Sequence, residues 1–281
     1  FNSIYIHRCY ARVGNVMSNF TDFIGGGGGA LFTVPITAST TWTPPFDGTG
    51  VIHVIGAGGS GANNYNSSGA AGGYSKKAVT FATGTNWTLV VGAGGAAVNT
   101  TYGNYGQGNT GGTSSATDGT STLTANGGVG GQTASLAAGG TASGGDVNNT
   151  GGTGTRNYPT GGGAVGILGT GNSINSLSDT KGADSDIIGP YNPNAYGVLS
   201  GGGSGGFVTS VQLSGMYQSQ PAGFLAGGGA TLVNDSDGNW GKGQDGGIGG
   251  GGGSIKMGYP NLSWSGSGGN GYILIQYLTV S

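Results

Sequence analysis

Residues Val51–Ala62 read VIHVIGAGGSGA, and this stretch combines the two features that decide the fold. Five residues that favour β-structure run directly into a glycine-rich stretch. The same arrangement recurs at Trp87–Ala97, WTLVVGAGGAA, where the first glycine lies 36 positions after Gly56. A strand that ends in GAGG, then a glycine-rich excursion, then another strand therefore predicts a β-framework from which glycine segments project.

Glycine dominates the composition, with 70 glycines among 281 residues. The usual share is about 7%. The glycines follow no strict three-residue period and there are only 8 prolines, which excludes collagen. Since glycine has no side chain to bury, the backbone itself must supply much of the packing and hydrogen bonding. We expect an all-β protein with an antiparallel β-sandwich frame, a region of packed polyproline-II (polyglycine) helices, and distal loops.

Charge and apolar patterning exclude several classes of function. The net charge is −2, only 6% of residues are charged, and glutamate is absent. Without a basic patch we expect no nucleic-acid partner. Without an apolar run near about 20 residues we expect no membrane insertion. Cys9 is the only cysteine, so no intrachain disulfide is possible. The polar residues are mainly Ser, Thr, Asn and Gln, which suits a particle or an extracellular surface.

The first 30 residues differ from the rest of the chain. Residues 1–24 hold three of the eight phenylalanines and a single glycine, and residues 25–29 are all glycine. The alternation in SIYIHRCYARV predicts a strand with Ile4, Ile6, Arg8 and Tyr10 on one face. We interpret residues 1–30 as a docking strand and hinge, with an N-terminal strand of the main sheet as the alternative, and residues 31–281 as one glycine-rich domain.

Strand signals within residues 31–281 cluster at the two ends of the sequence. The last strand, Gly271–Val280, must return to an early partner, and we expect that partner to be Val51–Ile55. Further strands are expected at Leu31–Val34 and Thr37–Thr43, which Pro35 separates, and at Thr120–Thr124. A hairpin is expected from Gly72–Thr80 and Asn86–Val91, with its turn at Ala82–Thr85. Later glycine runs are Gly127–Gly131, Gly139–Gly145, Gly161–Gly166, Gly201–Gly206, Gly227–Gly229, Gly246–Gly253 and Gly266–Gly271.

Three stretches carry a family resemblance: WTPPFDGTGVIHVIGAGGSG from Trp42, GGYSKKAVTFATGTNWTLVVGAGG from Gly72, and GGNGYILIQY from Gly268. They resemble the glycine-rich domain of bacteriophage tail and tail-fibre proteins, and are similar to the glycine-rich adhesins at the tips of T-even-like long tail fibres. The resemblance implies a non-enzymatic virion protein of the tail, with no cofactor. It also implies a bundle of polyproline-II helices whose intervening loops touch the host surface.

Carried onto this chain, the resemblance implies contacts from aromatic inserts to a bacterial surface glycan or an outer-membrane protein. Tyrosine and tryptophan offer stacking area and a polar group at low entropic cost. Other virion fibre proteins would be partners; a homotrimer is common in the family, although no heptad pattern requires one here. The candidate contact residues are Tyr65, Tyr102, Tyr105, Tyr158, Tyr191, Tyr196, Tyr217, Trp240, Tyr259 and Trp264.

Other motifs favour structural roles. Gly56–Gly61 matches G-x-G-x-x-G, but no helix-forming sequence or acidic residue follows as a dinucleotide site requires. His53 lies mid-strand and is expected to have a hydrogen-bonded ring. Asp184–Asp186 and Asn234–Asn239 are read as turns rather than as calcium loops, because the EF-hand spacing is absent. We expect no metal site.

Three other functions compete with the virion protein. The main alternative is a subunit of an extracellular filament or surface layer, joined by addition of the N-terminal strand to a neighbour. An ice-binding protein would need a flat face of small residues, which the aromatic inserts interrupt. A glycan depolymerase would need paired carboxylates, and none are evident.

Overall fold

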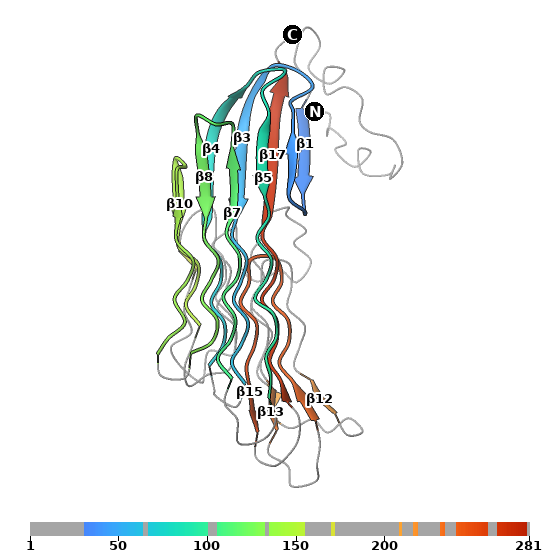
Figure 1. Cartoon of the computed structure of the whole chain (residues 1–281), viewed down its shortest axis with the longest axis vertical. Coiled ribbons are helices and arrows are strands. Elements are labelled where there is room, and N and C mark those ends of the chain that lie inside the picture. Colours follow the sequence, from blue (N-terminus) through green and yellow to red (C-terminus); the bar gives the residue numbers. More distant parts are fainter. Residues whose placement is uncertain are drawn as a thin grey trace, which may run out of the picture.

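The part of the chain described by the computed structural model comprises residues 31–63, 67–100, 106–132, 135–154, 170–171, 208–209, 216–218, 231–233, 240–257 and 263–279. These residues form strands and extended segments, and none of them belongs to an α-helix. They accordingly include no helix long and apolar enough to cross a membrane. Figure 1 shows an elongated molecule with long strands at one end, undulating segments along its length and short strands at the other end.

Two antiparallel sheets of five strands each form a β-sandwich at the end where the longest strands lie, as the sequence predicted. The first sheet has the spatial order β1 (Leu31–Ile36), β17 (Tyr272–Thr279), β3 (Gly48–Ile55), β4 (Tyr74–Phe81), β10 (Val147–Asn149). The second sheet has the order β2 (Thr40–Trp42), β5 (Trp87–Val90), β7 (Ser114–Thr117), β8 (Thr122–Ala125), β9 (Ala142–Ser143).

The core of the sandwich follows from strict alternation along the strands. Every second residue of β3 and of β17 faces the second sheet, which presents buried aromatic and aliphatic residues in return. Tyr277 packs among three aromatic rings, with centroid distances of 5.2 Å to Phe32, 5.0 Å to Phe81 and 5.8 Å to Trp42. The fully buried members include Ile52, Val54, Trp87, Leu89, Leu123, Ile273 and Ile275.

The predicted return of the last strand is confirmed. β17 pairs antiparallel with β3 over its whole length, with Tyr272 opposite Ile55 and Gln276 opposite Val51. It also pairs on its other side with β1, so Leu278 lies opposite Leu31. One sheet therefore joins the first and last strands of the described domain. Between these strands the chain makes several excursions, because it returns to the sandwich for β4 and β5, for β7 and β8, and for β9 and β10.

Two local predictions are wrong. Pro35 does not interrupt a strand, because β1 continues through it at the edge of the first sheet, where a missing N–H is tolerated. Residues 72–80 and 86–91 do not form a hairpin, because β4 pairs with β3 and β10 whereas β5 pairs with β2 and β7. The turn at Ala82–Thr85 carries the chain from one sheet to the other. The burial of Phe81 and Trp87, with ring centroids 5.8 Å apart, explains this crossing.

Residues 56–63, here called the central segment, bond to their neighbours with a period of three. The N–H groups of residues 56, 59 and 62 donate to carbonyls in segment 67–73, those of 57, 60 and 63 to segment 106–112, and those of 58 and 61 to segment 266–269. The N···O distances are 2.8 to 3.1 Å. Three residues per turn, with lateral bonds and none internal, is the geometry of a polyproline-II helix; a strand would repeat every two residues.

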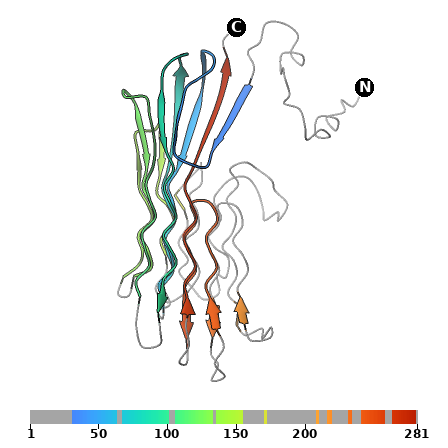
Figure 2. The same ribbon diagram turned by 45° about the vertical axis from the view of Figure 1, so that its right-hand side comes forward.

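Six segments surround the central segment. Besides the three that accept its hydrogen bonds, segments 126–131, 92–98 and 249–254 donate N–H bonds to its carbonyls. These six neighbours also bond to one another around the ring, so the arrangement in cross-section is a hexagonal lattice. The lattice comprises residues 56–63, 67–73, 92–98, 106–113, 126–132, 137–141, 150–154, 243–254 and 265–271. These are the undulating segments in the middle of Figure 2.

Glycines occupy the positions at which the lattice has no room for a side chain. A Cβ added to Gly58 or Gly61 would lie closer than 3.0 Å to the carbonyl oxygen of Gly250 or Gly253. Both glycines belong to the set that donates to segment 266–269. Ala57, which donates to segment 106–112, is fully buried with its methyl group accommodated. Lattice position therefore decides which residues are glycine.

Of the predicted glycine runs, residues 127–131, 246–253 and 266–271 lie in the lattice. The run 139–145 divides, because residues 142–143 form β9 and Gly144 turns with a φ of 82°. The runs 161–166, 201–206 and 227–229 lie outside the described residues, as do residues 1–30.

Candidate functional site at the distal end

Two short sheets lie at the end of the lattice opposite the sandwich (Figures 1 and 2). One contains β11 (Val208–Thr209), β13 (Thr231–Val233) and β15 (Ile255–Met257), all parallel. The other contains β12 (Met216–Gln218), β14 (Trp240–Lys242) and β16 (Ser263–Trp264), also parallel, with β6 (Asn99–Thr100) antiparallel at its edge. We call the four-stranded one the distal sheet.

Three of the ten candidate contact residues lie on the distal sheet. Tyr217 is in β12, Trp240 in β14 and Trp264 in β16, three strands that are direct neighbours. Met216 lies opposite Trp240, and Lys242 lies opposite Trp264. The other seven candidates lie outside the described residues: Tyr65, Tyr102, Tyr105, Tyr158, Tyr191, Tyr196 and Tyr259.

The described residues that flank four of those seven candidates also meet at this end. Ala62 N–H donates to Ser67 C=O, so the two lattice segments that precede and follow Tyr65 are hydrogen-bonded neighbours at this point. Asn63 forms a bridge with Gly106, which follows Tyr105, and Thr100, which precedes Tyr102, lies opposite Ser263. β15 and β16, at this same end, flank residues 258–262 and hence Tyr259.

Trp264 presents an indole side chain that is 43% exposed on a tightly bonded backbone. Its carbonyl accepts a hydrogen bond of 2.9 Å from Gly243 N–H. The next residue, Ser265, is buried; its N–H donates to Val98 C=O at 3.0 Å, and its Oγ accepts from Val98 N–H at 2.8 Å. An exposed tryptophan held between two neighbouring segments is preorganised for binding, because little backbone entropy is lost when a ligand stacks on it.

Asn99, which the sequence analysis did not single out, lies directly opposite Trp264 in the β16–β6 pair and is also exposed. Residues directly opposite in an antiparallel pair have Cβ atoms about 4.5–5.5 Å apart. The pair therefore combines an aromatic surface with an amide that can both donate and accept hydrogen bonds. Only the pairing of two residues 165 positions apart in sequence reveals this arrangement, and no local sequence pattern could have predicted it.

His53 is the only histidine among the described residues, and its environment is structural. It is 5% exposed, and its Nδ1 lies 2.7 Å from the Tyr74 hydroxyl oxygen, so the predicted hydrogen-bonded ring is confirmed. Burial, reinforced by the positive charge of Lys76 and opposed by a hydrogen bond to Gln276, lowers the pKa of His53 to about 4. The ring is accordingly neutral at physiological pH.

The Gly56–Gly61 motif lies in the central segment of the lattice. Each of its N–H groups donates to a backbone carbonyl, so none is free to bind a phosphate, and no helix follows. Among the described residues, no group of three or more His, Cys, Asp or Glu side chains could hold a metal ion. Asp184–Asp186 and Asn234–Asn239 lie outside these residues.

The profile of a family described as a glycine-rich domain matches residues 33–278. This span begins in β1 and ends in β17, so it coincides with the sandwich and everything between its first and last strands. No curated protein gives a significant match to the sequence.

Proposed function

We propose that this chain, which belongs to the glycine-rich domain family, is a non-enzymatic virion protein of a phage tail fibre or tail tip, and that its distal end binds the bacterial surface. The partner would be a surface glycan or an outer-membrane protein, and other fibre proteins would hold the sandwich end. The proposal takes its virion setting from the resemblance of the strand–GAGG frame, and its contact surface from the distal sheet.

The observation that carries the proposal is the separation of the two ends. Leu31 and Leu278 lie opposite each other at the sandwich end, so both ends of the described domain are there. Trp264 and the strands that bear Tyr217 and Trp240 lie at the far end of the lattice. A hydrogen-bonded lattice that separates both ends of the described domain from its aromatic residues suits a protein that reaches toward a surface.

The chemistry of Trp264 supports binding rather than catalysis at this end. The indole offers a large apolar surface and one N–H donor, and tryptophan is enriched among residues that dominate binding energy. Asn99 beside it can hydrogen-bond to a sugar hydroxyl or to a peptide group. Both ligand classes remain within the proposal.

Adsorption tests the proposal with a matched pair of variants. Trp264→Ala is expected to reduce binding of the purified protein to susceptible bacteria by at least about tenfold, as truncation of a central aromatic contact does. Phe46→Ala removes a ring that is 52% exposed at the sandwich end and is expected to leave binding unchanged. Equal binding by both variants and the unmodified protein, or no binding to any susceptible host, would reject the receptor role.

The second candidate is a subunit of an extracellular filament. Among the described strands, β1 has a partner on one side only, and a sheet edge of this kind can accept a strand from a neighbouring molecule. Electron microscopy of the concentrated protein separates the two proposals. Regular fibres that form without other fibre proteins would favour the filament.

A further inference from the structure

The outer face of the first sheet, which points away from the sandwich core, is covered over only half its length. Near the lattice, Ile55, Tyr74, Tyr272 and Leu274 are buried in a second apolar cluster, with Val147 and Ile248 packed against it. The apolar side chains on this half of the face are therefore already buried within the described residues. The other half, near the start of β3, has no such cover from the described residues.

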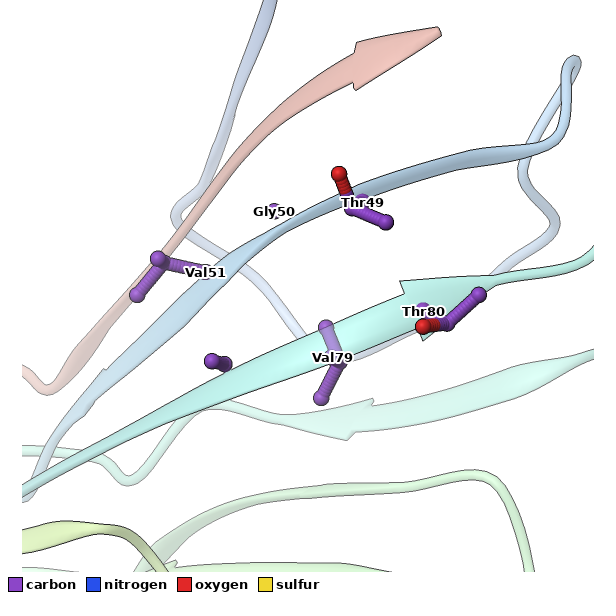
Figure 3. Close-up of a pocket in the computed structure, with 6 residues that line it drawn as sticks. Thr49, Gly50, Val51, Val79 and Thr80 are labelled. Atoms are coloured by element: carbon purple, nitrogen blue, oxygen red, sulfur yellow. The ribbon is translucent and has the colours of Figure 1, made fainter. Parts of the chain in front are cut away.

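The uncovered half carries aliphatic and small polar side chains, and one charge borders it: the Asp146 carboxylate accepts a hydrogen bond of 2.8 Å from Ala78 N–H. Leu31 and Leu278 lie opposite each other, alternate with core residues, and are 53% and 47% exposed. Beside them, Val51 lies opposite Ala78 in a shallow hollow of about 450 Å³ (Figure 3). The residues that line the hollow carry no charge: Thr49, Gly50, Val51, Ala78, Val79 and Thr80.

We propose that this outer face is the docking surface for residues 1–24 of the same chain. Residues 1–24 are followed by a run of five glycines, residues 25–29, which Ala30 joins to Leu31, and Leu31 itself lies on this face. Two and a half strand spacings of about 4.8 Å separate β1 from the hollow, or roughly 12 Å. Five extended residues span up to about 17 Å, so the glycine run can bring residues 1–24 onto the face.

The chemistry of residues 1–24 matches the surface. Ile4, Ile6 and Tyr10 recur at every second or fourth position, so an extended segment would direct them to one side. That side suits the leucine, valine and threonine side chains of this face. Arg8 shares this side, and its long stem can carry the guanidinium to the solvated rim. A short flexible tether gives an effective concentration in the millimolar range, which favours the segment of the same chain over that of a second copy.

Thiol accessibility in the full chain tests the docking. In a Cys9→Ser background, Ala78→Cys places a single thiol in the hollow. Thr88→Cys is the matched control, because Thr88 is exposed on the outer face of the second sheet, between the buried Trp87 and Leu89. Adding Ile4→Asp and Ile6→Asp is expected to raise the maleimide labelling rate at position 78 about tenfold, which corresponds to about 90% occupancy of the docked state. The rate at position 88 is expected to stay constant.

A second measurement uses the native thiol and leaves Ile4 and Ile6 intact. A short bismaleimide is expected to join Cys9 to the thiol of Ala78→Cys within one chain, and not to that of Thr88→Cys. An unchanged labelling rate at position 78 together with no selective cross-link would overturn the proposal. So would protection or cross-linking that rises with protein concentration and joins two chains, since the segment would then dock on a neighbour. None of these results depends on receptor binding, so the proposed function stands or falls separately.

Discussion

Gly58 is expected to be among the least replaceable residues of the lattice. It lies in the central segment, its N–H donates to Gly269 C=O at 2.8 Å, and a Cβ at this position would overlap the carbonyl of Gly250. Ordinary van der Waals contact for a Cβ begins at 3.4 Å. The obstacle is backbone held by further lattice bonds, so it cannot rotate aside as a side chain could.

The expected change in the free energy of unfolding for Gly58→Ala is the sum of three contributions. Forcing a methyl group into a packed site costs typically 1–3 kcal/mol. Moving segment 249–254 away also weakens the 2.8 Å bond from Gly252 N–H to Gly59 C=O, and each such bond contributes about 1 kcal/mol. The lower entropy of the unfolded alanine chain offsets about 0.4–1 kcal/mol. The free energy of unfolding should therefore fall by about 2 kcal/mol.

Chemical denaturation followed by tryptophan fluorescence measures this loss of stability. Two further variants serve as comparisons, one at a less crowded glycine and one at an exposed alanine. Gly112→Ala is expected to cost less, because the nearest atom to the added Cβ is Ala93 N at 2.9 Å, at a partly exposed position. Ala96→Ser lies on the exposed side of segment 92–98 and should change stability by less than about 0.5 kcal/mol. If Gly58→Ala unfolded at the same denaturant concentration as Ala96→Ser, the lattice account of the glycines would be refuted.

Three further predictions concern pH, a loop contact and register. The pKa of His53 is about 4 in the folded protein against 6.5 for an unperturbed ring. The neutral ring therefore contributes roughly 3 kcal/mol to the free energy of unfolding, and this contribution is complete above pH 6.5 and is lost as the pH falls toward 4. Denaturation series at pH 7 and pH 5 should show part of this loss, and the difference between the two pH values should be smaller in His53→Gln. Asp47 Oδ1 accepts bonds from Thr83 N–H and Oγ at 2.6 and 2.7 Å, which lower the pKa of Asp47; Asp47→Ala should therefore speed hydrogen exchange of the Thr83 amide, and a protected amide in this variant would contradict the contact. One glycine inserted after Gly58 rotates the following residues by a third of a turn, whereas three restore their orientation, so the single insertion should lower the melting temperature more; equal losses would argue against a threefold lattice.

The sandwich was predictable from sequence because its strands carry local signals. Val51–Ile55 and the last strand are runs of β-formers, and a strand at the end of one domain needs an early partner. The crossing at Ala82–Thr85 was not predictable in this way. A turn that joins two strands of one sheet and a turn that joins two sheets can share the same residues, and only the burial of both Phe81 and Trp87 in one core distinguishes them.

The candidate distal site could be predicted only as a class of residue. The aromatic residues between glycine runs were predicted contact residues, and the structure places Tyr217, Trp240 and Trp264 on adjacent strands of one sheet. Asn99 could not be found, because it lies opposite Trp264 only through the fold. The aromatic residues were visible because they interrupt a glycine-rich composition, whereas an asparagine is ordinary within it.

The lattice explains why a chain with so many glycines shows no simple glycine repeat. The residues of the central segment fall into three sets with a period of three, and each set donates its N–H groups to a different neighbouring segment. In the central segment, the side that donates to segment 266–269 holds only Gly58 and Gly61, whereas the side that donates to segment 106–112 holds Ala57, Ser60 and Asn63. Segment 67–73 follows the same logic, because the side that donates to segment 249–252 holds Gly69 and Gly72. Segments such as 67–73 and 106–113, which glycine runs alone did not indicate, belong to the lattice because only some of their sides require glycine. The requirement is set by neighbours that are remote in sequence, so it is a property of the assembled lattice rather than of any segment.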